Sequence, residues 1–83
     1  MVEPSHIVDR IKAALGDDTR VDVMDLTGTR DHYKAIVISD SFSGKLPLKR
    51  HRMIYAALAE EMKGPIHALT LEAYTSDEWA KLG

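Results

Sequence analysis

Residues 42–55 read FSGKLPLKRHRMIY, and this stretch decides where the chain passes from strand into helix. Pro47 suits the first turn of a helix, because the N–H that proline lacks has no helical acceptor there. Helical spacing continues to Met62, and the sequence KGP at residues 63–65 ends it. We expect one helical segment, with a break near Arg50 left open. Its inner, apolar members are Leu48, Met53, Ile54, Ala57, Leu58 and Met62, and its outer, charged members are Lys49, Arg50, Arg52, Glu60 and Glu61.

Period-two patterns before and after this segment predict three strands. Residues 20–26 alternate between apolar and polar, with their valines on one face. Residues 32–39 contain the β-branched run IVI, and residues 67–73 alternate again with leucines on one face. The loop of residues 27–31 is short, so the first two strands are expected to pair as a hairpin.

Helices are predicted near both ends of the chain. The first carries an apolar face at four-residue spacing, formed by Ile7, Ile11 and Leu15. Ser5 is its expected N-cap and Gly16 its expected stop. The last is a short helix carrying Trp79, and it is opened by the capping box TSDE at residues 75–78.

The order of these elements predicts the fold class. It is helix, strand, strand, one helix or two, strand, helix, within a single domain of residues 1–83. Three strands with one apolar face favour an α+β fold in which helices cover one side of the sheet and solvent the other. Periodicity alone does not fix the order of the strands.

Composition is that of an ordinary globular domain. The chain is 45% hydrophobic and 29% charged, and its net charge of −2 provides no overall attraction to phosphate. It contains no run of 18 apolar residues, which predicts that no helix spans a membrane. The first residues lack the basic and apolar segments of a signal peptide, so we expect a cytoplasmic protein.

The sequence contains no cysteine, which excludes disulfides, a thiol nucleophile and any cluster held by this chain's own thiolates. The nucleophile-elbow, zinc-protease and phosphate-loop motifs of common enzymes are also missing. Four histidines could form a zinc site only if the fold brought them together. We therefore expect a protein that is not an enzyme.

The stretch at residues 42–55, followed by IHAL at residues 66–69, resembles the BolA family, and the resemblance extends from about Val21 to Trp79. It implies a KH-like BolA fold with a three-stranded mixed sheet in the order α-β-β-α-α-β-α. It also implies an adaptor that partners monothiol glutaredoxins in iron–sulfur cluster trafficking or iron homeostasis. The two proteins would share a [2Fe–2S] cluster, with thiolates from the glutaredoxin cysteine and from glutathione. Alone, the chain would be a monomer or a weak homodimer.

Two histidines are candidate ligands of that cluster. Pattern alone favours a packed, hydrogen-bonded role for His67, because histidines on apolar faces are more often structural than ligating. The resemblance reverses this preference, since the histidine of the IHAL strand opening matches the family's recurring ligand. His32 is either a hairpin histidine paired with Asp31 or a second ligand oriented by that carboxylate. The longer loop with a further histidine or cysteine, found in many family members, is missing here.

The basic run Lys49, Arg50, His51 and Arg52 is a candidate contact surface. It could meet a partner's acidic surface or the carboxylates of glutathione, and Arg50 could instead have a structural role. DNA contact by a transcriptional regulator is the alternative. However, the chain lacks the GxxG loop with which KH domains clamp nucleotides, so the protein contact is preferred.

Overall fold

The computed structural model describes residues 3–26, 28, 32–64 and 68–82. Its α-helices are α1 (Pro4–Leu15), α2 (Pro47–Ala57) and α3 (Ser76–Leu82). Its strands are β1 (Arg20–Asp25), β2 (His32–Ile38) and β3 (Ala68–Tyr74). Two short 3-10 helices, η1 (Asp40–Phe42) and η2 (Glu61–Lys63), precede and follow α2.

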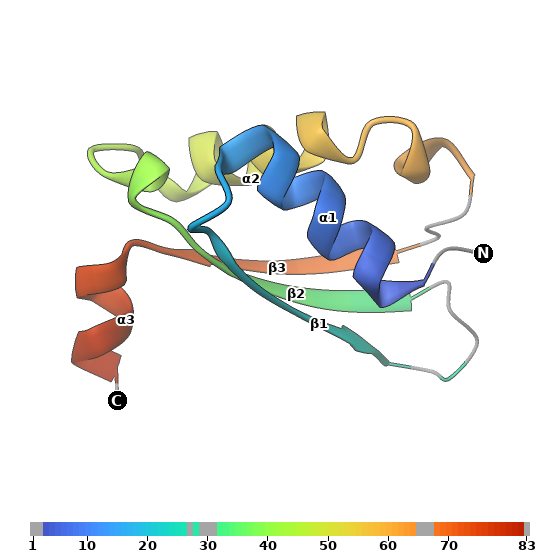
Figure 1. Ribbon diagram of the computed structural model, residues 1–83, viewed down its shortest axis with the longest axis horizontal. Coiled ribbons are helices and arrows are strands. Elements are labelled where there is room, and N and C mark those ends of the chain that lie inside the picture. The colour runs from blue at the N-terminus through green and yellow to red at the C-terminus, as the bar shows by residue number, and fades with distance from the viewer. Residues whose placement is uncertain (1–2, 27, 29–31, 65–67, 83) are drawn as a thin grey trace.

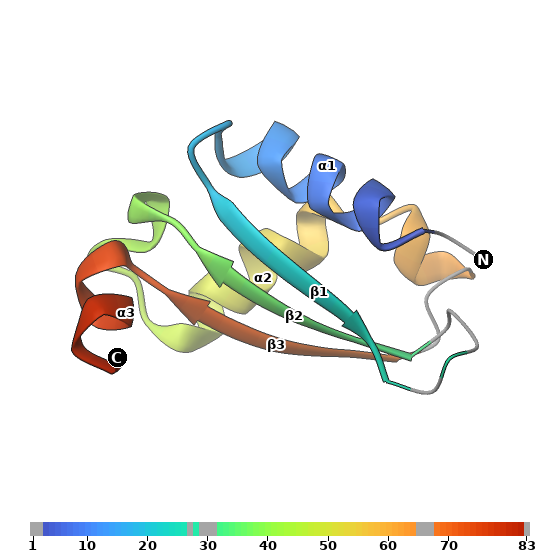
Figure 2. The same ribbon diagram turned by 60° about the horizontal axis from the view of Figure 1, so that its bottom comes forward.

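The three strands form one mixed sheet in the order β1-β2-β3, with β2 at its centre. β1 and β2 are antiparallel, as the hairpin prediction required, whereas β2 and β3 are parallel. Helices α1 and α2 lie side by side over one face of this sheet (Figure 1). On the opposite face, the only helix within the described residues is α3, which follows β3 at one end of the sheet (Figure 2). The predicted α+β fold with a mixed sheet is thus confirmed.

The core lies between the sheet and the two covering helices. It is built from the strand positions that alternate inward and from the apolar faces of α1 and α2. Its largest fully buried side chains are Tyr33, Phe42, Ile7, Ile11, Ile54, Leu58 and Val37. Phe42, from η1, extends this core into the connector between β2 and α2.

Two predicted helix boundaries are wrong. Helix α1 begins at Pro4, with Glu3 rather than Ser5 at the N-cap position, because proline's fixed φ suits the first helical turn. The helix that begins at Pro47 is continuous past Arg50 and ends at Ala57, after which η2 completes the connection. Gly16 ends α1 as expected, with φ +117° and its N–H donating to the Lys12 carbonyl.

The predicted inner and outer faces of the α2 segment also need correction. Arg50 and Glu61, expected outside, are each only 8% exposed, whereas Leu48, expected inside, is 63% exposed. Both buried charges have ion-pair partners far away in the sequence, Glu78 for Arg50 and His6 for Glu61. Such partners make the burial of a charge tolerable, and helical periodicity carries no information about them.

No helix within the described part of the chain combines the length and apolar character needed to cross a bilayer.

Candidate functional site

The first part of the candidate site is the end of the sheet where β2 begins. His32 is the first residue of β2 and is half-buried. Its backbone carbonyl accepts a hydrogen bond of 2.8 Å from the Leu26 N–H, which closes the hairpin beside it. In the parallel pairing of β2 with β3, the Cα partner of His32 is Ala68.

His67, the other predicted ligand, lies outside the described residues. It is covalently bonded to Ala68, the residue that the β2–β3 register sets opposite His32. His32 and Ala68, the described neighbour of His67 in the chain, therefore lie together at one end of the sheet. We call this end, defined by His32 and Ala68, the histidine end.

The side chains at the histidine end could hold a metal ion or an iron–sulfur cluster only if a second molecule supplied further ligands. Among the described residues, no group of three or more histidine and acidic side chains could hold a metal ion. The chain supplies no thiolate at all. Imidazole is a good ligand for iron, and His32 lies at a partly exposed strand end that another protein could reach.

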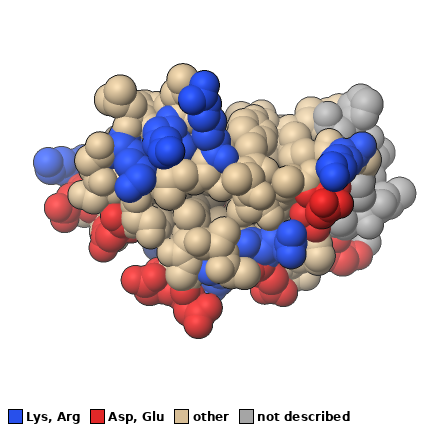
Figure 3. Space-filling view, turned by 90° about the horizontal axis from the view of Figure 1, so that it is seen from above, with Lys and Arg blue, Asp and Glu red and all other residues tan. Residues whose placement is uncertain are grey.

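The second part of the candidate site is the basic run of residues 49–52, whose side chains differ in their exposure to solvent. Lys49 and Arg52 are exposed, His51 is half-buried and Arg50 points inward. No acidic residue occurs between Asp40 and Glu60, and no ion pair of Lys49 or Arg52 is found among the described residues. Lysine and arginine side chains gather at the end of the helical face where α2 begins (Figure 3).

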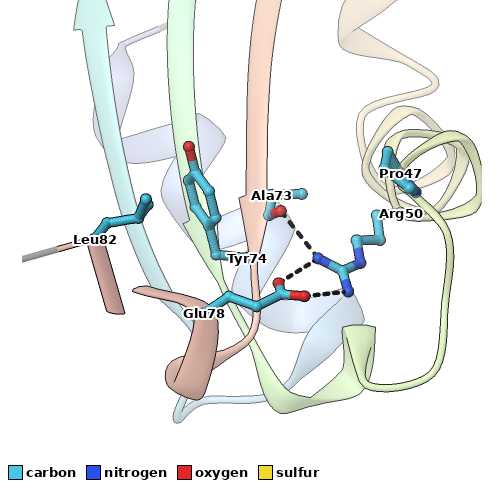
Figure 4. Close-up of a pocket in the computed structure, with 6 residues that line it drawn as sticks. All are labelled: Pro47, Arg50, Ala73, Tyr74, Glu78 and Leu82. Carbon is cyan, nitrogen blue, oxygen red and sulfur yellow. Dashed lines mark hydrogen bonds and ion pairs between the residues drawn. The ribbon is translucent and has the colours of Figure 1, made fainter. Parts of the chain in front are cut away.

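Arg50 joins three separate segments of the chain. Its Nε donates to the Lys45 carbonyl at 2.8 Å, and its Nη1 donates to the Ala73 carbonyl at 3.2 Å. The two Nη atoms also bind the Glu78 carboxylate, at 2.5 and 3.0 Å (Figure 4). The guanidinium lies over the Phe42 ring, 5.8 Å from its centroid. Arg50 thus has the structural role that the sequence analysis set beside partner contact.

An open pocket of about 310 Å³ lies beside this ion pair, between the start of α2, the end of β3 and α3 (Figure 4). Its lining residues are Pro47, Arg50, Ala73, Tyr74, Glu78 and Leu82. It lies at the opposite end of β3 from Ala68, so it is separate from the histidine end.

The predicted capping box opens α3 as expected. The Glu78 N–H donates to Thr75 Oγ1 at 3.2 Å, and the Thr75 N–H donates to Glu78 Oε1 at 2.8 Å. The Arg50 hydrogen bond, followed by the Thr75 N–H, lowers the pKa of Glu78 to about 2. This carboxylate therefore stays ionised and paired at any physiological pH.

Acid should lower the free energy of unfolding, because it protonates the Glu78 carboxylate. Because the folded pKa of Glu78 lies below its usual value of 4.5, its contribution is complete above about pH 4.5 and is lost as pH falls toward 2. Urea unfolding between pH 6 and pH 3 should show a falling midpoint, and Glu78→Gln should make this fall shallower. Asp77→Asn, on the same helix, is the control. An identical pH profile for wild type and Glu78→Gln would contradict the assignment.

Sequence reasoning missed a second ion pair, between α1 and η2. The His6 Nε2 atom lies 2.7 Å from Glu61 Oε2, and Arg10 Nε lies 3.6 Å from Glu61 Oε1. The His6 hydrogen bond is the main cause of a lowered pKa at Glu61. The partners are far apart in the sequence, so no local pattern could have revealed them.

Two helices over one face of a three-stranded mixed sheet, with one antiparallel and one parallel strand pair, define a small α+β protein of the KH-like class. The family model for BolA-like protein matches residues 7–78. The chain therefore belongs to the BolA family.

Two curated relatives illustrate the likeness. The chain is 48% identical to human BolA-like protein 1 over 52 residues, which are 63% of this chain and 38% of that protein. It is 49% identical to the DNA-binding transcriptional regulator BolA of Escherichia coli (strain K12) over 55 residues, 66% of this chain and 52% of that protein. The matched part is thus about half of each relative or less, and neither has the name of an enzyme.

Solved structures give the same result. A bolA protein homologue from Coxiella burnetii superposes with a TM-score of 0.82 at 36% identity, over 96% of this chain and 99% of the other. The BolA domain of SufE1 from Arabidopsis thaliana gives 0.81 at 32% identity, over 90% and 93%. Yeast Fra2 gives 0.77 at 34% identity, over 98% and 87%.

Proposed function

We propose that this chain is a non-enzymatic adaptor in iron–sulfur cluster trafficking or iron homeostasis. It binds a monothiol glutaredoxin, with a shared [2Fe–2S] cluster or without one. His67 is the first imidazole ligand in this proposal and His32 the second. The observation that supports the proposal is the register of β2 and β3, which pairs His32 with Ala68, the residue that follows His67 in the chain. Because the chain has no cysteine, histidine nitrogens are the ligands it can offer to iron.

The chemistry follows from what each molecule can donate. The glutaredoxin cysteine and glutathione supply the thiolates, and this chain supplies nitrogen. Exchanging thiolate ligands for imidazole raises the reduction potential of a [2Fe–2S] centre. Only neutral imidazole binds metal, so cluster retention should weaken in acid.

In this proposal, helix α2 contacts the partner and not the cluster. Lys49, His51 and Arg52 contact the partner's acidic surface or the glutathione carboxylates, whereas Arg50 supports the start of the helix from inside. We place the protein in the cytoplasm, and in the absence of its partner we expect a monomer or weak homodimer.

Anaerobic reconstitution tests this function. The chain is mixed with a monothiol glutaredoxin, glutathione, ferrous iron and sulfide, and the products are separated by size-exclusion chromatography. We expect an equimolar complex whose visible absorption and circular dichroism differ from those of glutaredoxin loaded alone. If the two proteins elute separately and the spectrum is that of the glutaredoxin alone, the proposal fails.

A nucleic-acid function is the second candidate. The observation that favours it is the exposed pair Lys49 and Arg52 in an acid-free segment, together with the name of the Escherichia coli relative. Such binding would depend steeply on salt, with a slope of about −0.9 per phosphate neutralised.

A salt titration with duplex DNA separates the two candidates. For a DNA-binding function we expect the double variant Lys49→Gln/Arg52→Gln to weaken binding and to reduce the salt slope by about two, one for each cation removed. Lys81→Gln, a change at an exposed lysine on α3, is the control. Micromolar or weaker binding that is the same in all three proteins would exclude this function. Fluorescence anisotropy measures both quantities.

A further inference from the structure

The two outer strands of the sheet, β1 and β3, differ in how their outer edges are covered. In β3 the Tyr74 carbonyl accepts a hydrogen bond on the β2 side, so the Leu69 and Ala73 carbonyls point to the outer edge. Side chains of α2 bind both of them. The Tyr55 hydroxyl donates to Leu69 at 3.5 Å, and Arg50 Nη1 donates to Ala73 at 3.2 Å. A further strand could pair with β3 only by displacing these contacts.

The outer edge of β1 has no such cover within the described part of the chain. The Leu26 N–H donates to the His32 carbonyl, so the even-numbered residues of the continuous β1–β2 register bond inward. The peptide groups of Val21 and Val23 therefore point to the outer edge, where no hydrogen bond joins them to another described residue. An unpaired edge of this kind is a template for the addition of another strand.

Helix α1 extends past β1 on the side away from β2 (Figure 2). His6 and Arg10 turn toward η2, so the opposite side of α1 faces the free edge of β1. That side carries Val8, Lys12 and Leu15, and the two apolar residues among them are only partly buried by their own chain. The β1 edge thus combines unpaired peptide groups with apolar surface, and both are needed for a strand-mediated interface.

The charges on β1 favour a second copy of this chain as the added strand. Antiparallel pairing of β1 with itself creates a two-fold axis, and directly opposite residues then share a face of the sheet. An axis through Val21 sets the exposed Arg20 of each copy opposite the exposed Asp22 of the other, which gives two pairs of opposite charge. An axis through Asp22 would oppose two carboxylates. One through Val23 would set Arg20 opposite Leu26, without any ion pair.

We propose that the chain forms a two-fold homodimer in which β1 pairs with β1 of a second copy, with the axis through Val21. The N–H and carbonyl of each Val21 bond those of the other, and the two α1 helices pack through Val8 and Leu15. The two three-stranded sheets become one continuous sheet. This inference does not depend on a glutaredoxin, and it assigns self-association to a defined surface.

The proposed dimer leaves the histidine end open. Arg20 pairs with Ile38 of β2, whereas His32 lies at the other end of that strand. The two-fold axis therefore lies near the end of β1 that is farthest from His32. Helix α2 covers the β3 edge, on the opposite side of the sheet from β1. Both copies could therefore bind other molecules at these places while they are paired.

Sedimentation equilibrium of the full chain, at concentrations up to about 1 mM, tests the proposal. We expect wild type to dimerise over this range. Arg20→Glu and Asp22→Lys should each weaken self-association about tenfold, because each variant sets like charges opposite one another twice. An equimolar mixture of the two variants should recover dimerisation, because opposite charges then face each other again at both places. Lys81→Glu, a change at an exposed lysine of α3, is the control.

The charge variants should keep the fold, because the side chains of Arg20 and Asp22 are 65% and 52% exposed. Slower amide hydrogen exchange of Val21 and Val23 at high protein concentration would support the proposed edge. A wild-type chain that stays monomeric up to about 1 mM would overturn the proposal. Self-association that neither charge variant weakens, or that the mixture does not recover, would overturn it too, because the interface would then lie elsewhere or have another register.

Discussion

Replacement of His67 by alanine should abolish the spectrum that is specific to the mixed complex of this chain with a monothiol glutaredoxin. The apo proteins should still associate, because the surface proposed for docking lies on α2 and not at the histidine end. The physical reason is the donor set: with no cysteine in the chain, imidazole is the strongest iron ligand it can offer. The measurement is visible circular dichroism after anaerobic reconstitution, with apo binding determined in parallel.

Two further variants sharpen this test. His67→Cys should restore a cluster, with an altered spectrum and a lower reduction potential, because a thiolate replaces an imidazole. His32→Ala should shorten the lifetime of the cluster if His32 is the second ligand, and should have no effect if it is only a hairpin residue. A mixed-complex spectrum unchanged by His67→Ala would remove that residue from the site.

Arg50→Met should produce the largest loss of stability, about 2–3 kcal/mol, since hydrogen bonds of a charged group are worth about 1.5–3 kcal/mol and their loss leaves acceptors unpaired. Methionine keeps much of the volume packed near Phe42, so the change reports on the polar contacts. The carbonyls of Lys45 and Ala73 lose their donors, and the Glu78 carboxylate loses its partner. For a domain of this size the midpoint of thermal unfolding should fall by about 10–20 °C.

Arg52→Met is the matched control, two positions further along the same helix. Arg52 is exposed and has no ion pair among the described residues, so its replacement should change the free energy of unfolding by less than about 0.5 kcal/mol. Calorimetry or chemical unfolding of both variants makes the comparison. Equal losses would mean that the hydrogen bonds of Arg50 add no more to stability than the exposed side chain of Arg52 does. Arg50→Lys should be only partly tolerated, because one ammonium group cannot span three acceptors.

The features that could be predicted from the sequence are those that depend on short-range interactions along the chain. The alternation around Val21 and the β-branched run at residues 36–38 marked β1 and β2, because side chains of a strand alternate between its faces. Pro47 marked the first turn of α2, and Thr75 with Glu78 marked the start of α3. Each of these features depends on residues within a few positions of one another.

The candidate site was only partly predictable. The sequence identified His32 as a residue at the entry of a strand, and the resemblance singled out His67. The neighbourhood of His32 and Ala68 depends on parallel pairing between strands that are joined by α2, and no local pattern sets that register. The exposure of Leu48 and Tyr55 likewise depends on which side of α2 meets the sheet.

The order of residues along the chain was enough to predict most of the helices and strands, their order, the absence of any thiolate and the positive charge of α2. The inward position of Arg50, the outward position of Arg52 and the burial of Glu61 against His6 became visible only in the folded chain. The reason is that periodicity and capping are short-range properties of the chain. The cost of burying a charge, in contrast, depends on whether a partner is brought to it from a distant segment, which only the complete fold can do.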